Sequence, residues 1–172
     1  MKLKEYIFYT IIAALYAVLS LVIGGFAFGI VQFRYAEVLN ILALKNKKFI
    51  WSLTLGCFIT NLIGVLSGTN PIGILDVIIG SLATLIAGYL MYYLKDKKIY
   101  GLPIWSLLMP ALINGIIIGA ELTYVFTPET LVVGFYLNFI SVFVSEFIIV
   151  TIFGTLLMKP LFKNLEYVKI KL

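Results

Sequence analysis

The chain has 172 residues, of which 62% are hydrophobic and 12% are charged, and its mean hydropathy is +1.10. Soluble domains have about 45–50% apolar and about 25% charged residues, so this chain has too much apolar surface to bury inside one soluble domain. The absence of His and the single cysteine, Cys57, exclude a disulfide framework, a Cys/His zinc site and a His general base. The composition therefore predicts an integral membrane protein with no resident cofactor or metal, and it argues against an enzyme.

Six apolar segments follow one another along the chain. A bilayer crossing takes about 17–25 residues, and five of the segments reach that length. In chain order the six are residues 6–23, 31–44, 49–66, 72–94, 105–126 and 131–157. The second has only 14 residues and carries Arg34, Glu37 and Asn40. As an α-helix it is about 21 Å long, so it is either a short helix or one that continues through the Gly-rich residues 24–29.

The basic residues predict the orientation of these segments. Twelve of the thirteen lie near the two termini and in two connections: Lys2, Lys4, Lys45, Lys47, Lys48, Lys95, Lys97, Lys98, Lys159, Lys163, Lys169 and Lys171. The positive-inside rule places all four regions in the cytoplasm, which requires that residues 31–44 also cross. We therefore expect an all-α bundle of six transmembrane helices, a single domain over residues 1–172 in the plasma membrane, with cytoplasmic N- and C-termini. The positive charge then reports topology and gives no reason to expect a nucleic-acid partner.

Polar residues inside the apolar segments are the main functional signal, because an ionisable group at membrane depth costs a few kcal/mol or more. On the predicted topology most of them converge on the outer half of the bundle. We expect the substrate-binding residues to be Gln32, Phe33, Arg34, Glu37, Asn61, Asp76, Asn114, Glu121 and Asn138, with Glu146 nearer the midplane.

Structural roles compete with ligand binding at several of these positions. Arg34 and Glu37 could form a self-neutralising pair on one helix, and Asp76 could simply start a helix near the interface. Asn114 and Asn138 fit either role equally well. Hydroxyl groups in membrane helices often bond a neighbouring helix, and we expect that role for Ser81, Thr84, Ser141 and Ser145.

One arginine against Glu37, Asp76, Glu121 and Glu146 leaves an excess of acids. Such a pocket favours a ligand that is cationic or rich in hydrogen-bond donors, and a carboxylate can accept two parallel N–H donors from the planar edge of a guanine-type base.

A separate feature is Ala13 and Ala17, a small-xxx-small pair in the first segment. It serves either docking of another subunit's helix or packing within this chain.

Several stretches together resemble one family of small membrane proteins. They are Val31-Gln32-Phe33-Arg34-Tyr35-Ala36-Glu37, Leu55-Gly56-Cys57-Phe58-Ile59-Thr60-Asn61, Asp76-Val77-Ile78-Ile79-Gly80-Ser81-Leu82-Ala83-Thr84-Leu85 and, more loosely, Asn114-Gly115 before Glu121. The chain resembles the substrate-binding (S) subunits of energy-coupling-factor (ECF) vitamin transporters, and within them the QueT family of queuosine-precursor transporters.

The resemblance implies a mechanism and partners. An S subunit binds a scarce metabolite from outside, docks on a membrane T subunit that carries two ATPases, and topples to release its cargo inward. The chain has no G-x-x-x-x-G-K-[ST] motif, so ATP would be used by the partners alone. The implied substrate is a 7-deazaguanine queuosine precursor, in the aminomethyl form, and Ala13 and Ala17 resemble the family's docking pair.

The resemblance assigns roles to the polar residues. Glu37, Asp76 and Glu121 would accept from the base edge or the ammonium group, Arg34 would anchor a ligand carbonyl or hold Glu37, and the amides would orient the ligand. The alternatives are a stand-alone ion channel or proton-coupled carrier, which would need a polar path to both faces, and a membrane assembly protein.

Overall fold

The computed structural model describes residues 3–22, 28–29 and 33–167, and nearly all of them belong to helices. The elements are α1 (Leu3–Leu21), the 3₁₀-helix η1 (Tyr35–Leu44), α3 (Lys47–Leu66), α4 (Ile74–Leu94), α5 (Ile104–Leu107), α6 (Met109–Phe126), the 3₁₀ turn η2 (Pro128–Thr130), α7 (Leu131–Glu146), the π-helix η3 (Phe147–Phe153) and α8 (Gly154–Tyr167). Five helical stretches within the described residues are long and apolar enough to cross a membrane, and Tyr35–Leu44 is a shorter apolar helix. The predicted all-α membrane bundle is confirmed.

Local sequence explains where several helices begin and end. Asn46 caps α3, because its side-chain oxygen accepts a hydrogen bond from the Lys48 backbone N–H at 2.9 Å. Gly73, with a φ of 81°, precedes α4 in a conformation that suits glycine. Pro110 lies in the first turn of α6, where its missing N–H costs nothing, and the chain bends there between α5 and α6.

The second crossing differs in kind from the short α-helix that the sequence predicted. Residues Tyr35–Leu44 form a 3₁₀-helix, which rises about 2.0 Å per residue instead of 1.5 Å. Ten residues therefore reach about 20 Å. Arg34, at its start, contacts Asp76 in the first turn of α4, and Lys45, at its end, lines the same hollow as Lys95 beyond the last turn of α4. The tighter helix thus runs along the depth of α4, as the sixth crossing requires.

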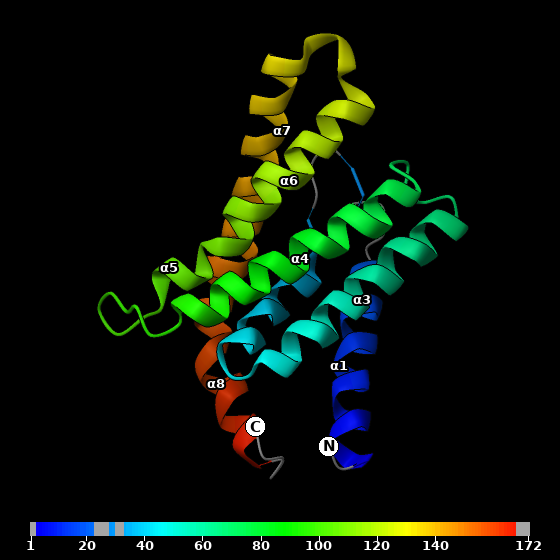
Figure 1. Cartoon of the computed structure of the whole chain (residues 1–172). Coiled ribbons are helices and arrows are strands. Elements are labelled where there is room, and N and C mark those ends of the chain that lie inside the picture. Colours follow the sequence, from blue (N-terminus) through cyan, green and yellow to red (C-terminus); the bar gives the residue numbers. More distant parts are fainter. Residues whose placement is uncertain (1–2, 23–27, 30–32, 168–172) are drawn as a thin grey trace.

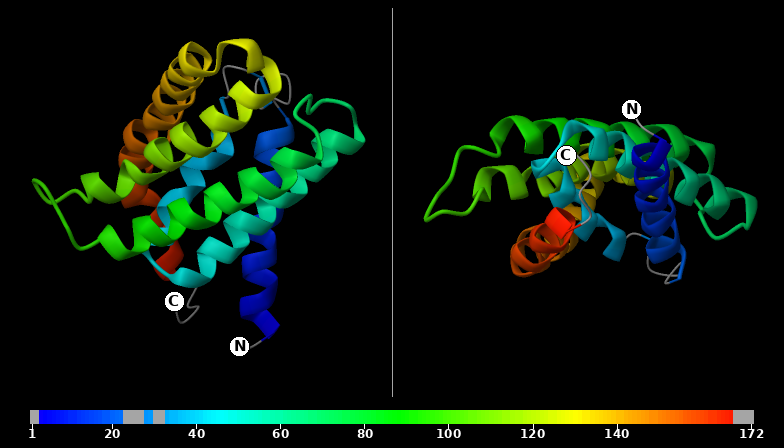
Figure 2. Two further views of the ribbon diagram at one scale, coloured as in Figure 1. Left: turned by 45° about the horizontal axis from the view of Figure 1, so that its top comes forward. Right: turned by 90° about the horizontal axis from the view of Figure 1, so that it is seen from below.

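The helices pack in a continuous series with η1 beside it (Figure 1). Helix α3 packs between α1 and α4, α4 contacts α6, and α6 pairs with α7, while η1 contacts α1, α3, α4 and the η3–α8 end of the last crossing. Seen from below, α1 and α8 lie on the same side of the α3–α4 pair (Figure 2). Segment η1 is consequently enclosed by the rest of the bundle, and Ala36, Ile41 and Ala43 are completely buried.

Helix α1 begins and α8 ends at the same end of the molecule (Figure 1). The two Lys-rich connections meet at one hollow on the structure, which places them on a common side. This arrangement agrees with the predicted alternation of crossings, and the assignment of that side to the cytoplasm stays a prediction.

Candidate substrate-binding site

Arg34 and Asp76 form a buried ion pair that joins the start of η1 to the first turn of α4. The Arg34 Nη2 atom lies 3.0 Å from Asp76 Oδ2, and the two residues are 5% and 0% exposed. Asn70 Nδ2 donates to the same oxygen at 2.8 Å, and Asn61 Nδ2 donates to the Asp76 backbone carbonyl at 2.7 Å. Asp76 therefore does more than start a helix, since its carboxylate holds Arg34 and the connection between α3 and α4.

Gly80 makes room for this arrangement one turn further along α4. A Cβ atom at Gly80 would collide with Asp76 Oδ1 and would lie 2.7 Å from Asn61 Nδ2. The second carboxylate oxygen of Asp76 is therefore packed against its own helix, and it has no hydrogen-bond partner among the described residues. Its position against Gly80 leaves Asp76 poorly placed to accept a ligand's donors.

Glu37 lies in a separate polar cluster between α1, η1 and α3. Its carboxylate accepts hydrogen bonds from the Tyr16 hydroxyl and from the Asn40 side-chain amide. Arg34 also acts on it electrostatically, but the ion pair that the structure shows for Arg34 is with Asp76. Both oxygens of Glu37 thus have donors from the protein itself.

The α6–α7 pair carries two further polar contacts at the depth of the bundle. Asn114 Nδ2 donates to Glu146 Oε1 at 2.9 Å, and Asn138 Nδ2 donates to Thr123 Oγ1 at 3.0 Å. Each contact joins α6 to α7, so both amides have the structural role that was one of their two predicted alternatives. The Asn114 carbonyl oxygen and Glu146 Oε2 have no hydrogen-bond partner among the described residues, which leaves them as acceptors.

Glu121, on α6, is the buried acid with the fewest hydrogen-bond partners among the described residues. The residue is 4% exposed, and neither Oε1 nor Oε2 has a hydrogen-bond partner within the described part of the chain. The charged groups that act on it electrostatically are Asp76 and Arg34, which belong to the first cluster. A carboxyl group in this position needs a proton or donors from a ligand, because burial without a partner is costly.

Electrostatic interactions connect the clusters across the bundle. Arg34 acts on Glu37, Glu121 and Glu146, and Glu37 acts on Glu146. The four acids that the sequence singled out therefore surround one region next to the single buried arginine. Among the described residues of this region, the buried polar atoms without a hydrogen-bond partner are all oxygen acceptors: Asn61 Oδ1, Asp76 Oδ1, Asn114 Oδ1, both Glu121 oxygens and Glu146 Oε2. A complementary ligand must therefore supply hydrogen-bond donors.

Two other predicted residues fit less directly. Gln32 lies outside the described residues. Phe33 is half-buried, packs against the core formed around Ile41 and Leu107, and has its ring 6.5 Å from that of Tyr35. Arg34 has its guanidinium carbon 5.5 Å from the centre of the Phe28 ring, so a different aromatic residue stacks near the site.

Ala13 and Ala17 are buried within the chain, at 2% and 5% exposure. A Cβ at Gly56 of α3 would lie 2.8 Å from the Ala13 carbonyl oxygen, which shows how closely α1 and α3 approach. The pair therefore has the packing role that was one of its two predicted alternatives, and docking on a partner stays a prediction. Their small side chains serve packing inside the chain, and the outward face of α1 is formed instead by residues such as Ile7, Ile11 and Val18, which are all exposed.

The predicted bonds to neighbouring helices are wrong for Ser81 and Ser145, whereas the Thr84 hydroxyl also hydrogen-bonds the Cys57 side chain of α3. Ser81 donates to Val77 O, Thr84 to Gly80 O, and Ser145 to Ser141 O and Val142 O, all within their own helices. A serine or threonine in a helix reaches the carbonyl one turn back more easily than another helix.

Sequence reasoning did not select Tyr16, Asn70 or Thr123. Tyr16 lies in an apolar helix without any local signal for a polar role. Asn70 stands directly before Pro71 in a connection, where asparagine is common for turn geometry alone. Their contacts with Glu37, Asp76 and Asn138 arise only when the helices pack.

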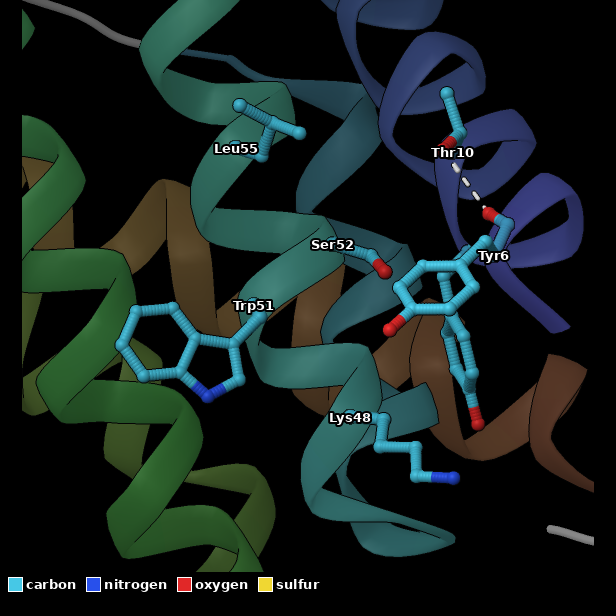
Figure 3. Close-up of a pocket in the computed structure, with 7 residues that line it drawn as sticks. Tyr6, Thr10, Lys48, Trp51, Ser52 and Leu55 are labelled. Atoms are coloured by element: carbon cyan, nitrogen blue, oxygen red, sulfur yellow. Dashed lines mark hydrogen bonds between the residues drawn. The ribbon is translucent and has the colours of Figure 1, made fainter. Parts of the chain in front are cut away.

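Four hollows that described residues line lie away from these acids. One of about 240 Å³ opens between α1 and α3 and includes Tyr6, Lys48 and Trp51 (Figure 3). In it, Lys48 Nζ lies 3.3 Å from Glu5 Oε2, and the aromatic and lysine side chains are typical of a membrane interface. The part of the chain that the structure describes contains no group of three or more His, Cys, Asp or Glu side chains that could hold a metal ion.

Comparison with known proteins agrees with the membrane fold. The family model described as "QueT transporter" matches residues 7–163. The chain is also similar to the "Queuosine precursor transporter QueT" of Lactococcus lactis subsp. cremoris (strain MG1363), with 39% identity over 98 residues, which is 56% of this chain and 54% of that relative. The match thus spans about half the length of the curated relative. No solved structure matches the chain. The protein is a multi-pass protein of the plasma membrane, and it belongs to the QueT transporter family.

Proposed function

We propose that this chain is the substrate-binding subunit of an ECF-type uptake transporter and that it binds a queuosine precursor, 7-aminomethyl-7-deazaguanine, from the outer face. Membership of a transporter family and the name of the Lactococcus relative support transport of such a precursor. The acid-rich interior supports a ligand of this chemistry, because the base carries several N–H donors and an ammonium group.

The observation that carries the proposal is Glu121, a buried carboxylate with two oxygens that lack partners among the described residues. The planar edge of a guanine-type base presents a ring N–H and an exocyclic amino group side by side. These two donors match the two oxygens of one carboxylate in parallel hydrogen bonds. Glu146 Oε2 and the Asn114 carbonyl oxygen remain as acceptors for the rest of the ligand.

The other two acids then support the site. Glu37 already accepts from Tyr16 and Asn40, and Asp76 already holds Arg34 and Asn70. Their charges shape the potential around Glu121. Both Glu37 oxygens and Asp76 Oδ2 already accept from the protein, while Asp76 Oδ1 is packed against Gly80. The three acids that the sequence grouped together therefore have different roles in this proposal.

Calorimetry on the purified protein tests the assignment. The aminomethyl and cyano forms of 7-deazaguanine share the same donor edge, so both should bind without any partner subunit. The variant Glu121→Gln keeps the size of the side chain but replaces one acceptor by a donor. We expect it to weaken binding of both forms by about 10-fold or more, because a hydrogen bond to a charged group contributes about 1.5–3 kcal/mol.

Glu129→Gln is the matched control, because Glu129 is an exposed acid in the turn between α6 and α7. It should leave the affinity unchanged. If Glu121→Gln weakened only the aminomethyl form, Glu121 would contact the ammonium group and the edge assignment would be wrong. If neither form bound to the native protein, the proposed substrate would be wrong.

The energy source is tested separately. An ECF-type mechanism needs a T subunit and two ATPases, and docking through α1 would have to use its exposed face, since Ala13 and Ala17 are buried. Liposomes that contain the complete assembly should take up the precursor only with internal ATP. Uptake by this chain alone would instead support a stand-alone carrier.

A further inference from the structure

Asn114 on α6 and Glu146 at the end of α7 form a second group of buried acceptors, apart from Glu121. Asn114 Nδ2 donates to Glu146 Oε1 at 2.9 Å, so the amide and the carboxylate hold each other in position. The two residues are 5% and 7% exposed. Asn114 Oδ1 and Glu146 Oε2 have no hydrogen-bond partner among the described residues. Two buried acceptors of this kind are costly unless a donor comes from outside the chain.

Close packing of α6 against α7 sets the geometry of this acceptor pair. A Cβ at Gly115 would lie 3.0 Å from Cε2 of the Phe139 ring and 3.4 Å from Phe143 Cβ, so the glycine lets α7 approach α6 directly beside Asn114. After Glu146 the last crossing changes to the π-helix η3, and wide turns of this kind are frequent at functional sites. Packing therefore places the two acceptors while it leaves one oxygen of each without a partner.

The acceptor pair lies further from the α6–α7 turn than Glu121, on the same face of α6. Asn114 and Glu121 are seven residues apart in one helix, which is close to two full turns and about 10.5 Å along the helix axis. Ile118 lies between them on this face and is 3% exposed. A ligand that has hydrogen-bond donors at both ends matches two groups of acceptors with this spacing.

The charges around Glu146 favour a cation as its partner. Glu37 and Arg34 both act on Glu146 electrostatically, and Arg34 already holds Asp76 at 3.0 Å, whereas Glu37 adds a second negative charge. An ammonium group supplies three N–H donors and a positive charge. It can therefore donate to Asn114 Oδ1 and Glu146 Oε2 together, in bonds that the two charges strengthen.

We propose that the Asn114–Glu146 pair binds the ammonium group of the substrate and selects the aminomethyl form of the base over the cyano form. This assignment rests on the proposed function, in which Glu121 accepts from the donor edge of the base. The donor edge belongs to the six-membered ring of 7-deazaguanine and the C7 substituent to the five-membered ring, so the two groups meet different acceptors. A cyano nitrogen is itself an acceptor, and it would leave both oxygens of the pair without a donor.

Calorimetry with three ligands on the native protein tests the selectivity. The aminomethyl, cyano and methyl forms of 7-deazaguanine share the donor edge and differ at C7. The aminomethyl form should bind at least about 10-fold more tightly than the other two, because its ammonium group alone can pair with the Glu146 carboxylate. Equal affinity for the aminomethyl and methyl forms would overturn this assignment while the proposed function stood. Binding of none of the three would refute the proposed function, and this assignment with it.

The variant Glu146→Gln separates recognition of the ammonium group from a structural role. Glutamine keeps the size of the side chain and an oxygen for the Asn114 amide, but it carries no charge. It should weaken binding of the aminomethyl form about 10-fold and leave the affinity for the cyano and methyl forms unchanged. Glu121→Gln should instead weaken all three and keep the selectivity. An equal loss for all three ligands in Glu146→Gln would show a structural role and overturn the assignment.

Glu129→Gln, in the exposed turn between α6 and α7, is again the control and should bind all three ligands as the native protein does. A sodium ion is the competing occupant of the two acceptors. Binding of the aminomethyl form should be the same in sodium chloride and in choline chloride of equal ionic strength, and a requirement for sodium would overturn the assignment. Both comparisons on the native protein remain decisive if Glu146→Gln fails to fold.

Discussion

At the scale of single residues, the buried acids of this bundle differ in whether other residues of the chain donate hydrogen bonds to them. Asp76 and Glu37 accept hydrogen bonds or an ion pair from the chain itself. Glu121 has no such partner among the described residues. Because an unused buried acceptor is costly, the difference between these acids is the strongest sign of which one meets a ligand.

The Arg34–Asp76 pair gives a stability prediction at this scale. Asp76→Ala leaves the Arg34 guanidinium without its 3.0 Å partner in a buried position, and loss of one member of a buried pair costs about 3–5 kcal/mol. The double variant R34M/D76A removes both charges and should recover most of that loss. Unfolding of the purified protein by heat or denaturant in detergent measures both variants.

A double variant that is at least as unstable as Asp76→Ala would contradict this prediction. It would mean that the stability at this position comes from other contacts of the two residues. The comparison is informative because it separates the loss of one charge of the ion pair from the loss of both charges.

At the scale of elements, close approach of helices decides where polar side chains meet. Helices α1 and α3 touch at Gly56, where a Cβ would lie 2.7 Å from the Tyr16 Cβ and 2.8 Å from the Ala13 carbonyl oxygen. These atoms belong to the backbone or lie next to it, so they cannot move without shifting a helix. The same approach brings the Tyr16 hydroxyl to Glu37.

Gly56→Ala should therefore destabilise the protein by about 1–3 kcal/mol, as overpacking of a core does. Alanine favours a helix over glycine by about 1 kcal/mol, so the steric effect must exceed that gain for the prediction to hold. Thermal unfolding in detergent measures the change.

Gly115→Ala in α6 is a suitable control for the Gly56 variant. Its Cβ would lie 3.0 Å from Cε2 of the Phe139 ring, and a ring edge can move more easily than a backbone atom. A Gly56 variant that is as stable as the control would show that α1 and α3 can separate at little cost.

Two of the crossings depart from α-helical geometry, and both carry acids. Glu37 lies on the 3₁₀-helix η1, and Glu146 is the last residue before the π-helix η3. The two segments pack against each other. The tighter coil of η1 lets ten residues cover a depth that an α-helix of that length would not reach, and this is why a short polar segment can cross beside α4.

At the scale of the whole molecule, the lysine-rich connections and the α6–α7 turn lie at opposite ends, as the predicted topology requires. The lysines of residues 45–48 and 95–98 gather at one end, while the turn at Pro128–Thr130 lies at the other end, between α6 and α7 (Figure 1). An aromatic layer accompanies the lysines: Lys47 Nζ lies 4.9 Å from the centre of the Tyr93 ring. Aromatic and basic residues together are typical of the interface on the cytoplasmic side.

Cysteine labelling tests this orientation. The native Cys57 is fully buried, so the native protein should react little with a membrane-impermeant maleimide. Glu129→Cys should be labelled in intact cells, because we expect the α6–α7 turn to lie outside. Lys97→Cys should be labelled only after the membrane is opened. The reverse pattern would contradict the predicted topology.

The sequence alone determined the membrane class, the five long apolar helices and the resemblance to the family, because apolar segment length and short motifs are local properties. It also determined which acids lie inside the bundle. Only the tertiary structure decided how those acids differ, since Tyr16 on α1 reaches Glu37 and Arg34 reaches Asp76 through packing. The burial of Ala13 and Ala17 and the 3₁₀ form of η1 were likewise decided by neighbouring helices. A residue's partners depend on which helix faces come together, and the sequence of one segment does not contain that information.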